Sequence, residues 1–112
     1  MKTSSTYTAT IYVGFRERYT GTVRDIEAAR QYIQKVTNEG GLCVTLTPTE
    51  FIYKDGSEPG CIVGLINYPR FPQTPEQIRT KATYLADSLM RIYQQLKVSI
   101  VFPDETVMLE SE

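Results

Sequence analysis

The stretch Tyr7-Thr-Ala-Thr-Ile-Tyr-Val-Gly-Phe15 decides the fold, because its side chains alternate in character along the chain. The odd-numbered positions are apolar or aromatic, whereas the even-numbered ones are two threonines, a tyrosine and a glycine. A period of two predicts a β-strand with one face in the core. We therefore place a strand over Tyr7–Phe15.

The segments after this strand predict a helix and then two further strands. The helix ends at the glycines of Asn38–Gly41. The strand over Leu42–Tyr53 contains Pro48, which cannot donate to a ladder, so we expect this strand at a sheet edge. Asp55-Gly56 then predicts a hairpin turn, and the apolar run Cys61–Ile66 predicts a central strand.

A second helix has the clearest start in the chain. Thr74-Pro75-Glu76-Gln77 combines a cap, a proline at the first helical position and a glutamine at the third. Apolar residues then recur at steps of three and four: Ile78, Ala82, Leu85, Leu89, Ile92 and Leu96. They predict an amphipathic helix of about five turns. A last strand over Lys97–Phe102 and a short extra strand through Val107–Leu109 follow.

The order strand, helix, strand, strand, helix, strand is typical of a ferredoxin-like βαββαβ sandwich. We expect a four-stranded sheet with both helices on one face, and Tyr7–Phe15 and Cys61–Ile66 as adjacent, parallel central strands. The 112 residues predict a single domain over 1–112, in which residues 1–5 and 110–112 are flexible ends.

Composition excludes several classes of function. With 41% hydrophobic and 22% charged residues and a net charge of −1, the chain is typical of a globular protein and unsuited to binding duplex nucleic acid in bulk. The absence of histidine removes histidine bases and most catalytic zinc sites, so we expect no catalytic residue, metal or cofactor. Cys43 and Cys61 are interpreted as free, buried thiols. The polar N-terminus and the lack of a long apolar run favour a cytoplasmic protein without a membrane partner.

An anion-binding site is predicted at one edge of the sheet. If the central strands are parallel, the loops after them leave the same edge, beside the N-termini of both helices. Arg16, Arg18 and Arg70 would then hold a phosphate. In the same loops, Asn67 would form hydrogen bonds with a polar edge of the ligand, and the ring of Tyr19 or Tyr68 would stack on the ligand. The alternative is that each arginine forms a solvated surface ion pair.

The sheet face away from the helices is predicted to be an interface between copies of the chain. Its residues would be Tyr12, Gly14, Ile62, Gly64 and Ile66. With Gly14 and Gly64 side by side, the face would contain a shallow trough walled by Tyr12 and Ile62. A monomer would expose a large apolar area there, which favours a homo-oligomer; a ligand platform is the alternative.

Two short resemblances suggest other functions. Ile11-Tyr-Val-Gly-Phe15 resembles the first-strand motif of RNA recognition motif domains, which implies that Tyr12 stacks on a base. The companion motif is represented only by Gly64 and Tyr68, so RNA binding ranks second. Acylphosphatases share the expected fold, and Arg16 and Asn67 resemble their arginine and asparagine in type. Catalysis ranks below binding in this interpretation.

Two further resemblances cover longer stretches. Gly40–Pro48, followed by Phe51–Gly56, is similar to the middle of the CutA and PII-like families. That similarity implies ferredoxin-like trimers that bind nucleotides or other small anions between subunits. The segments Thr47–Tyr53 and Leu65–Pro72 look like those of small proteins encoded by bacteriophages and prophages, which implies a role in capturing a host defence signal.

The sequence thus predicts a non-enzymatic, homo-oligomeric protein that binds a small anionic, nucleotide-like molecule. The alternatives are an RNA-binding module that uses the open sheet face and a module that serves only assembly.

Overall fold

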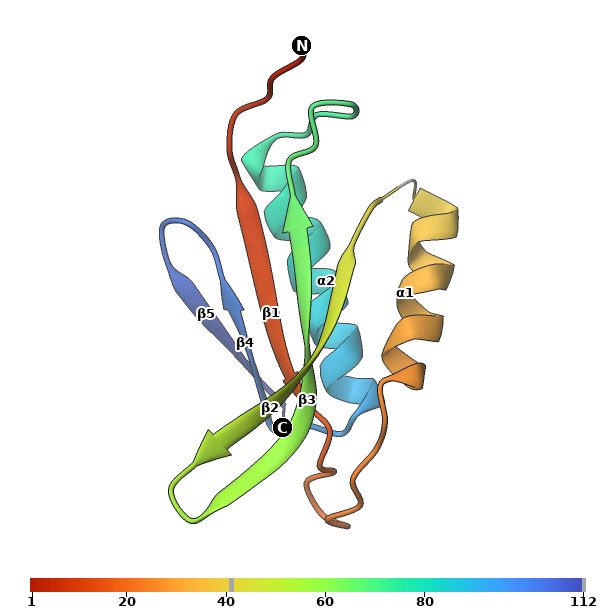
Figure 1. Cartoon of the computed structure of the whole chain (residues 1–112), viewed down its shortest axis with the longest axis vertical. Coiled ribbons are helices and arrows are strands. Elements are labelled where there is room, and N and C mark those ends of the chain that lie inside the picture. The colour runs from red at the N-terminus through yellow and green to blue at the C-terminus, as the bar shows by residue number, and fades with distance from the viewer. Residues whose placement is uncertain (41, 112) are drawn as a thin grey trace.

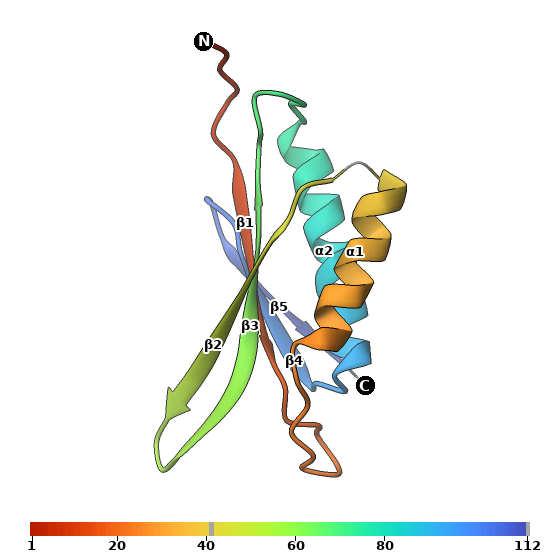
Figure 2. The same cartoon turned by 45° about the vertical axis from the view of Figure 1, so that its right-hand side comes forward.

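Two helices lie against one face of a five-stranded antiparallel sheet in the computed structural model, which describes residues 1–40 and 42–111 (Figure 1). The elements are β1 (Thr8–Gly14), α1 (Glu27–Gly40), β2 (Thr45–Tyr53), β3 (Gly56–Ile66), α2 (Pro75–Ile92), β4 (Lys97–Val101) and β5 (Thr106–Glu110). The sheet order is β2-β3-β1-β4-β5, and the face away from the helices carries no helix of the described chain (Figure 2). Gly41 of the predicted helix stop and Glu112 of the predicted flexible end lie outside the described residues.

The prediction of parallel central strands is wrong. β1 and β3 are neighbours, but they run antiparallel, with Thr8 opposite Ile66 and Gly14 opposite Gly60. The crossover through α1 makes β1 parallel to β2, and the hairpin then returns β3 between them in the opposite direction. The sheet also has five strands instead of four, because the predicted C-terminal extension pairs along its whole length with β4.

The β2–β3 hairpin is long and curves away from the helices (Figures 1 and 2). Tyr53 pairs with Gly56 across a two-residue turn, in which Asp55 has a positive φ of 61°. Pro48 lies in β2 opposite Cys61, and β2 is an edge strand as predicted. The β2–β3 end of the sheet therefore extends past the layer of helices.

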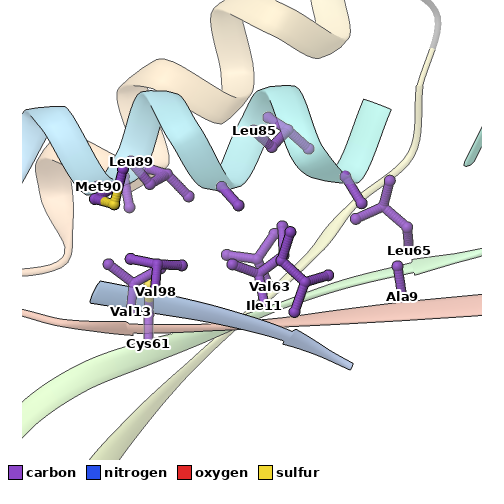
Figure 3. Packing of buried hydrophobic residues seen from close by; sticks show 14 of the residues in the cluster. Ala9, Ile11, Val13, Cys61, Val63, Leu65, Leu85, Leu89, Met90 and Val98 are labelled. Carbon is purple, nitrogen blue, oxygen red and sulfur yellow. The ribbon is translucent and has the colours of Figure 1, made fainter. Parts of the chain in front are cut away.

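The core lies between the sheet and α2 (Figure 3). The helix begins with the predicted capping box, in which Thr74 and Gln77 exchange hydrogen bonds. Leu85 and Leu89 face buried residues of the sheet, which include Ala9, Ile11, Val13, Cys61, Val63, Leu65 and Val98. Burial raises the pKa of the Cys61 thiol to about 12. Cys61 is thus the buried free thiol that was predicted, whereas Cys43 is exposed.

Tyr93, at the end of α2, connects both helices. It is completely buried, and its ring stacks on Phe15 with 4.5 Å between centroids. The hydroxyl accepts a hydrogen bond from the Ala29 N–H and donates one to the Asp25 carbonyl. Burial raises the pKa of Tyr93. These bonds hold the first turn of α1 against the last turn of α2.

Arg79 joins α2 to the β4–β5 turn. Its guanidinium forms ion pairs with Asp104 at 3.1 Å and Glu105 at 2.7 Å, and it lies 4.2 Å from the centroid of the Phe102 ring. Hydrogen bonds to the Tyr7 hydroxyl and to Glu105 raise the pKa of Arg79. The turn between the last two strands is thereby fastened to the helix layer.

Leu89→Ala should lower the free energy of unfolding by about 2–5 kcal/mol, because Leu89 is fully buried and its loss leaves a cavity. Leu96→Ala is the matched control: it belongs to the same predicted apolar stripe, but 49% of Leu96 is exposed. The control should change stability by less than about 0.5 kcal/mol. Urea denaturation measures both, and equal losses would contradict this account of the core.

Candidate functional site

The six residues predicted to bind an anion do not form one site. Arg16, Arg18 and Tyr19 follow β1, whereas Asn67, Tyr68 and Arg70 follow β3. Because β1 and β3 are antiparallel, these loops leave opposite ends of the sheet, as Figure 1 shows. The loop after β1 lies beside the start of β3, and the loop after β3 lies beside the N-terminal segment. Within one copy of the chain, the three arginines therefore do not line a single pocket.

In the loop after β3, the residues mainly organise the loop itself. Asn67 is buried; its Nδ2 donates to the Ser5 carbonyl, and its Oδ1 accepts from the Gln73 N–H. The ring of Tyr68 packs on Phe71 at 5.4 Å, and a hydrogen bond with the Cys43 thiol raises the pKa of Tyr68. Arg70 is exposed.

In the loop after β1, Arg18 contacts both its neighbour and the C-terminal segment. Nη1 of Arg18 donates to the Ser111 hydroxyl at 2.5 Å, and its guanidinium lies 4.7 Å from the centroid of the Tyr19 ring. Arg16 lies close to the β2–β3 hairpin, where its Nη2 donates to the Ser57 carbonyl at 3.2 Å. A binding role for each of these residues stays a prediction.

The residues predicted as an interface do lie on the open face of the sheet, but the trough is elsewhere. Tyr12 pairs directly with Ile62, as expected. Gly14 lies opposite Gly60, and Gly64 lies opposite Thr10. A Cβ added to Gly64 would be 2.5 Å from Oγ1 of Thr45, so that position is covered. The hollow on this face lies instead at the other end, where Gly14 lines a cleft.

A cleft of about 200 Å³ opens at this end of the sheet, and we call it the open-face cleft. Its lining comes from four strands and the segment before β4: Tyr12, Gly14, Phe51, Glu58, Gln95, Lys97 and Ser99. It contains aromatic rings, a carboxylate, an amide, an ammonium and a hydroxyl. This set of groups is suited to a polar ligand that also has an aromatic portion.

The apolar wall of the cleft is an aromatic pair. The rings of Tyr12 and Phe51 meet edge to face, with 6.5 Å between centroids and 66° between planes. Phe51 reaches this place because Gly60 has no side chain: a Cβ at Gly60 would collide with the Phe51 ring and with the carbonyl of Val13. The glycine therefore positions the ring.

The polar wall is held by backbone hydrogen bonds. Glu58 Oε2 accepts from the Arg16 N–H at 3.0 Å. Gln95 Nε2 donates to the carbonyls of Arg16 at 2.7 Å and Tyr93 at 3.0 Å. The carboxylate and the amide are thus oriented before any ligand arrives. Larger hollows, of about 460 and 520 Å³, lie along α2 and β5.

Sequence reasoning found Tyr12 and Gly14 but missed the other lining residues. The alternation of β1 pointed to Tyr12 and Gly14. The correct hairpin register would have placed Phe51 opposite Glu58 on the adjoining strands. No local pattern indicates Gln95, which follows Gln94, a non-glycine residue with a positive φ of 51°.

Among the described residues, no helix is both long enough and apolar enough to cross a bilayer. The arrangement is that of an α+β protein with a small depression on the open face of an antiparallel sheet.

Comparison with known proteins adds to this description. No protein-family model matches the sequence, those of the CutA and PII-like families included, and no curated protein matches it. A solved structure of a phage SAM lyase in complex with S-methyl-5'-thioadenosine matches with a TM-score of 0.82 at 14% identity, over 100% of this chain and 95% of that chain. A phage SAM lyase in the apo state matches with a TM-score of 0.79 at 16% identity, over 95% of this chain and 90% of that chain.

These matches establish the shared fold and correct the predicted function. The prediction of a non-enzymatic binding protein is contradicted, because the two matched structures are both named as an enzyme. Both are phage proteins, in agreement with the resemblance to phage-encoded proteins, and one of them holds a nucleoside derivative.

Gly60→Ala should reduce the free energy of unfolding by about 1–3 kcal/mol, because the new Cβ would push against the Phe51 ring and a backbone carbonyl that cannot move freely. Gly40→Ala is the control, since a Cβ added at that helical position would have no described atom within 4 Å apart from its chain neighbours and the nearby backbone of its own helix. The control should be as stable as the wild type or slightly more stable. If urea denaturation gives the same midpoint for both variants, the close approach at Gly60 is refuted.

Proposed function

We propose that this protein is a lyase that cleaves SAM (S-adenosylmethionine) in the open-face cleft and releases S-methyl-5'-thioadenosine. The observation that carries the proposal is the match over the whole chain to a phage SAM lyase in complex with that nucleoside. The lining of the open-face cleft supports it, because rings, a carboxylate and an ammonium occur together there. We also propose that β2-β3-β1-β4 with the two helices is a ferredoxin-like core, to which β5 adds an edge strand.

The reaction we propose needs no base from the protein. The bond between the sulfonium sulfur and Cγ of the aminobutyrate portion breaks, and its electron pair goes to sulfur, which yields the neutral thioether. An oxygen of the substrate's own carboxylate forms a bond to the same Cγ, which closes a five-membered lactone. No proton is transferred, and the positive charge of the α-ammonium group remains on the lactone. A chain without histidine can therefore support this step.

The contribution of the protein is then to hold the substrate in a reactive conformation. The rings of Tyr12 and Phe51 would contact the adenine, since bases stack on aromatic side chains. Lys97 and Ser99, both on β4, would bind the carboxylate end and the ribose hydroxyls. A folded carboxylate lies close to Cγ, and such positioning accounts for much of the acceleration of an intramolecular reaction.

The size of the cleft bears on self-association. About 200 Å³ is below the roughly 300–1,000 Å³ that small-molecule sites occupy, so a single copy would enclose only part of SAM. The same sheet face exposes Ile66, Val101 and Met108. We propose that a second copy covers these residues and closes the cleft, in keeping with the homo-oligomer expected from the sequence.

Incubation of the purified protein with SAM should produce S-methyl-5'-thioadenosine, detected by liquid chromatography. Tyr12→Ala should raise KM for SAM about 5- to 150-fold, because stacking on a base contributes roughly 1–3 kcal/mol. Tyr84→Ala is the matched control, since Tyr84 is an exposed tyrosine on α2. A folded wild-type protein that leaves SAM intact would refute the lyase, and equal KM values for the two variants would remove the cleft as its site.

Sedimentation at tens of micromolar should show more than one subunit for the wild type. Val101→Arg should shift the protein toward the monomer without unfolding it, because Val101 is partly exposed on the open face and a buried, unpaired charge is costly. Tyr84→Arg, on the helix layer, should leave the subunit number unchanged. A wild type that sediments as a monomer at this concentration argues against closure by a second copy.

A further inference from the structure

Two oxygen atoms lie beside the bare backbone of Gly14 in the open-face cleft. If Gly14 carried a Cβ, that atom would be 3.0 Å from Oε1 of Gln95 and 3.0 Å from Oε2 of Glu58. The two oxygens therefore lie at most twice that distance apart. Hydrogen bonds from N–H to O are about 2.7–3.2 Å long, so one donor group in the cleft that lies between the two oxygens can reach both.

The hydrogen-bond partners of Gln95 determine that its side-chain oxygen points into the cleft. Nε2 of Gln95 donates to the carbonyls of Arg16 and Tyr93, and a carbonyl can only accept. A rotated amide would place its oxygen against two carbonyl oxygens, which is unfavourable. The side chain therefore keeps its nitrogen toward the backbone and its acceptor in the cleft.

Glu58 adds negative charge to this acceptor pair. Its Oε2 accepts one hydrogen bond, from the Arg16 N–H, and a neutral donor orients a carboxylate without cancelling its charge. The other charged group in the lining is Lys97. Glu58 is only partly exposed, so its attraction for a cation is screened less than that of a fully exposed carboxylate.

We propose that Glu58 Oε2 and Gln95 Oε1, both next to Gly14, form a subsite for the α-ammonium group of SAM; this inference rests on the proposed function. An ammonium has three donors and no acceptor, which matches two acceptor oxygens and a carboxylate. A side chain at residue 14 would press against both oxygens, so the glycine lets Glu58 and Gln95 keep these positions in the cleft. Gln95 and Glu58 are thereby assigned to recognition of the amino-acid portion.

The α-ammonium fits this role better than the sulfonium. The sulfonium loses its charge as the C–S bond breaks, so a carboxylate beside it would stabilise the substrate more than the transition state. The α-ammonium keeps its charge from substrate to lactone, so the same carboxylate stabilises all states of the reaction equally. The subsite should therefore lower KM with little effect on kcat. It should also favour SAM over released S-methyl-5'-thioadenosine, which has no ammonium.

Calorimetric titration with two probes that are not cleaved tests the subsite. S-adenosylhomocysteine carries the α-ammonium but no sulfonium, whereas S-methyl-5'-thioadenosine carries neither. Glu58→Gln should weaken binding of S-adenosylhomocysteine about tenfold or more and leave binding of S-methyl-5'-thioadenosine within about twofold. Gly14→Ala should act in the same direction, because its Cβ would lie 3.0 Å from each of the two oxygens and displace them. Gln95→Met, similar in size but without an acceptor, gives a second test should the other variants unfold.

The outcomes separate the subsite from the proposed function. If the variants weaken both probes equally, or if only SAM itself is affected, the ammonium subsite is refuted while SAM cleavage by the wild type still supports the lyase. A KM that is unchanged in all three variants refutes the subsite as well. If the folded wild type neither cleaves SAM nor binds S-methyl-5'-thioadenosine, the proposed function fails, and the assignment of Glu58 and Gln95 to the ammonium fails with it.

Discussion

The antiparallel pairing of β1 with β3 is the constraint on which the rest of the structure depends. It places Gly14 opposite Gly60, so that two residues without side chains lie together at one end of the open sheet face. It also brings the end of β1 next to the start of β3, where the Arg16 N–H binds Glu58. The position of the two glycines and that of Glu58 in the polar wall of the open-face cleft both follow from the direction of this one strand pair.

The helix layer is connected to the cleft through Tyr93. Its side chain binds backbone groups of Asp25 and Ala29 near the start of α1, and its carbonyl accepts from Gln95 in the cleft. The orientation of Gln95 is therefore determined by a residue that is anchored in the core. A polar group supported in this way keeps its direction more reliably than one on a free loop.

Local elements could be predicted from the sequence because their causes are local. The capping box at Thr74 and the edge position of Pro48 depend on neighbouring residues and were predicted correctly. The direction of β3 depends on where the crossover places β2, and no pattern within β1 or β3 contains that information. Because β3 runs antiparallel to β1, Arg16 and Arg70 lie at opposite ends of the sheet, and the single anion site predicted from the sequence does not form within one copy. The sequence does not indicate Gln95, because its orientation depends on two backbone carbonyls. The carbonyl of Arg16 is far away in the sequence, and that of Tyr93 lies in the irregular segment after α2.

The absence of histidine was interpreted as evidence against an enzyme, and that inference was too broad. It excludes reactions that need an imidazole to move a proton near neutral pH. It does not exclude a reaction whose nucleophile and leaving group both belong to the substrate, because such a reaction needs conformational control and charge complementarity instead. In the reaction that we propose, the open-face cleft would provide groups for both: an aromatic pair for a flat base, and oriented oxygens beside Gly14 for a cation. For a proposed reaction of this kind, the orientation of polar groups in a cleft is thus a better guide than an inventory of acid–base residues.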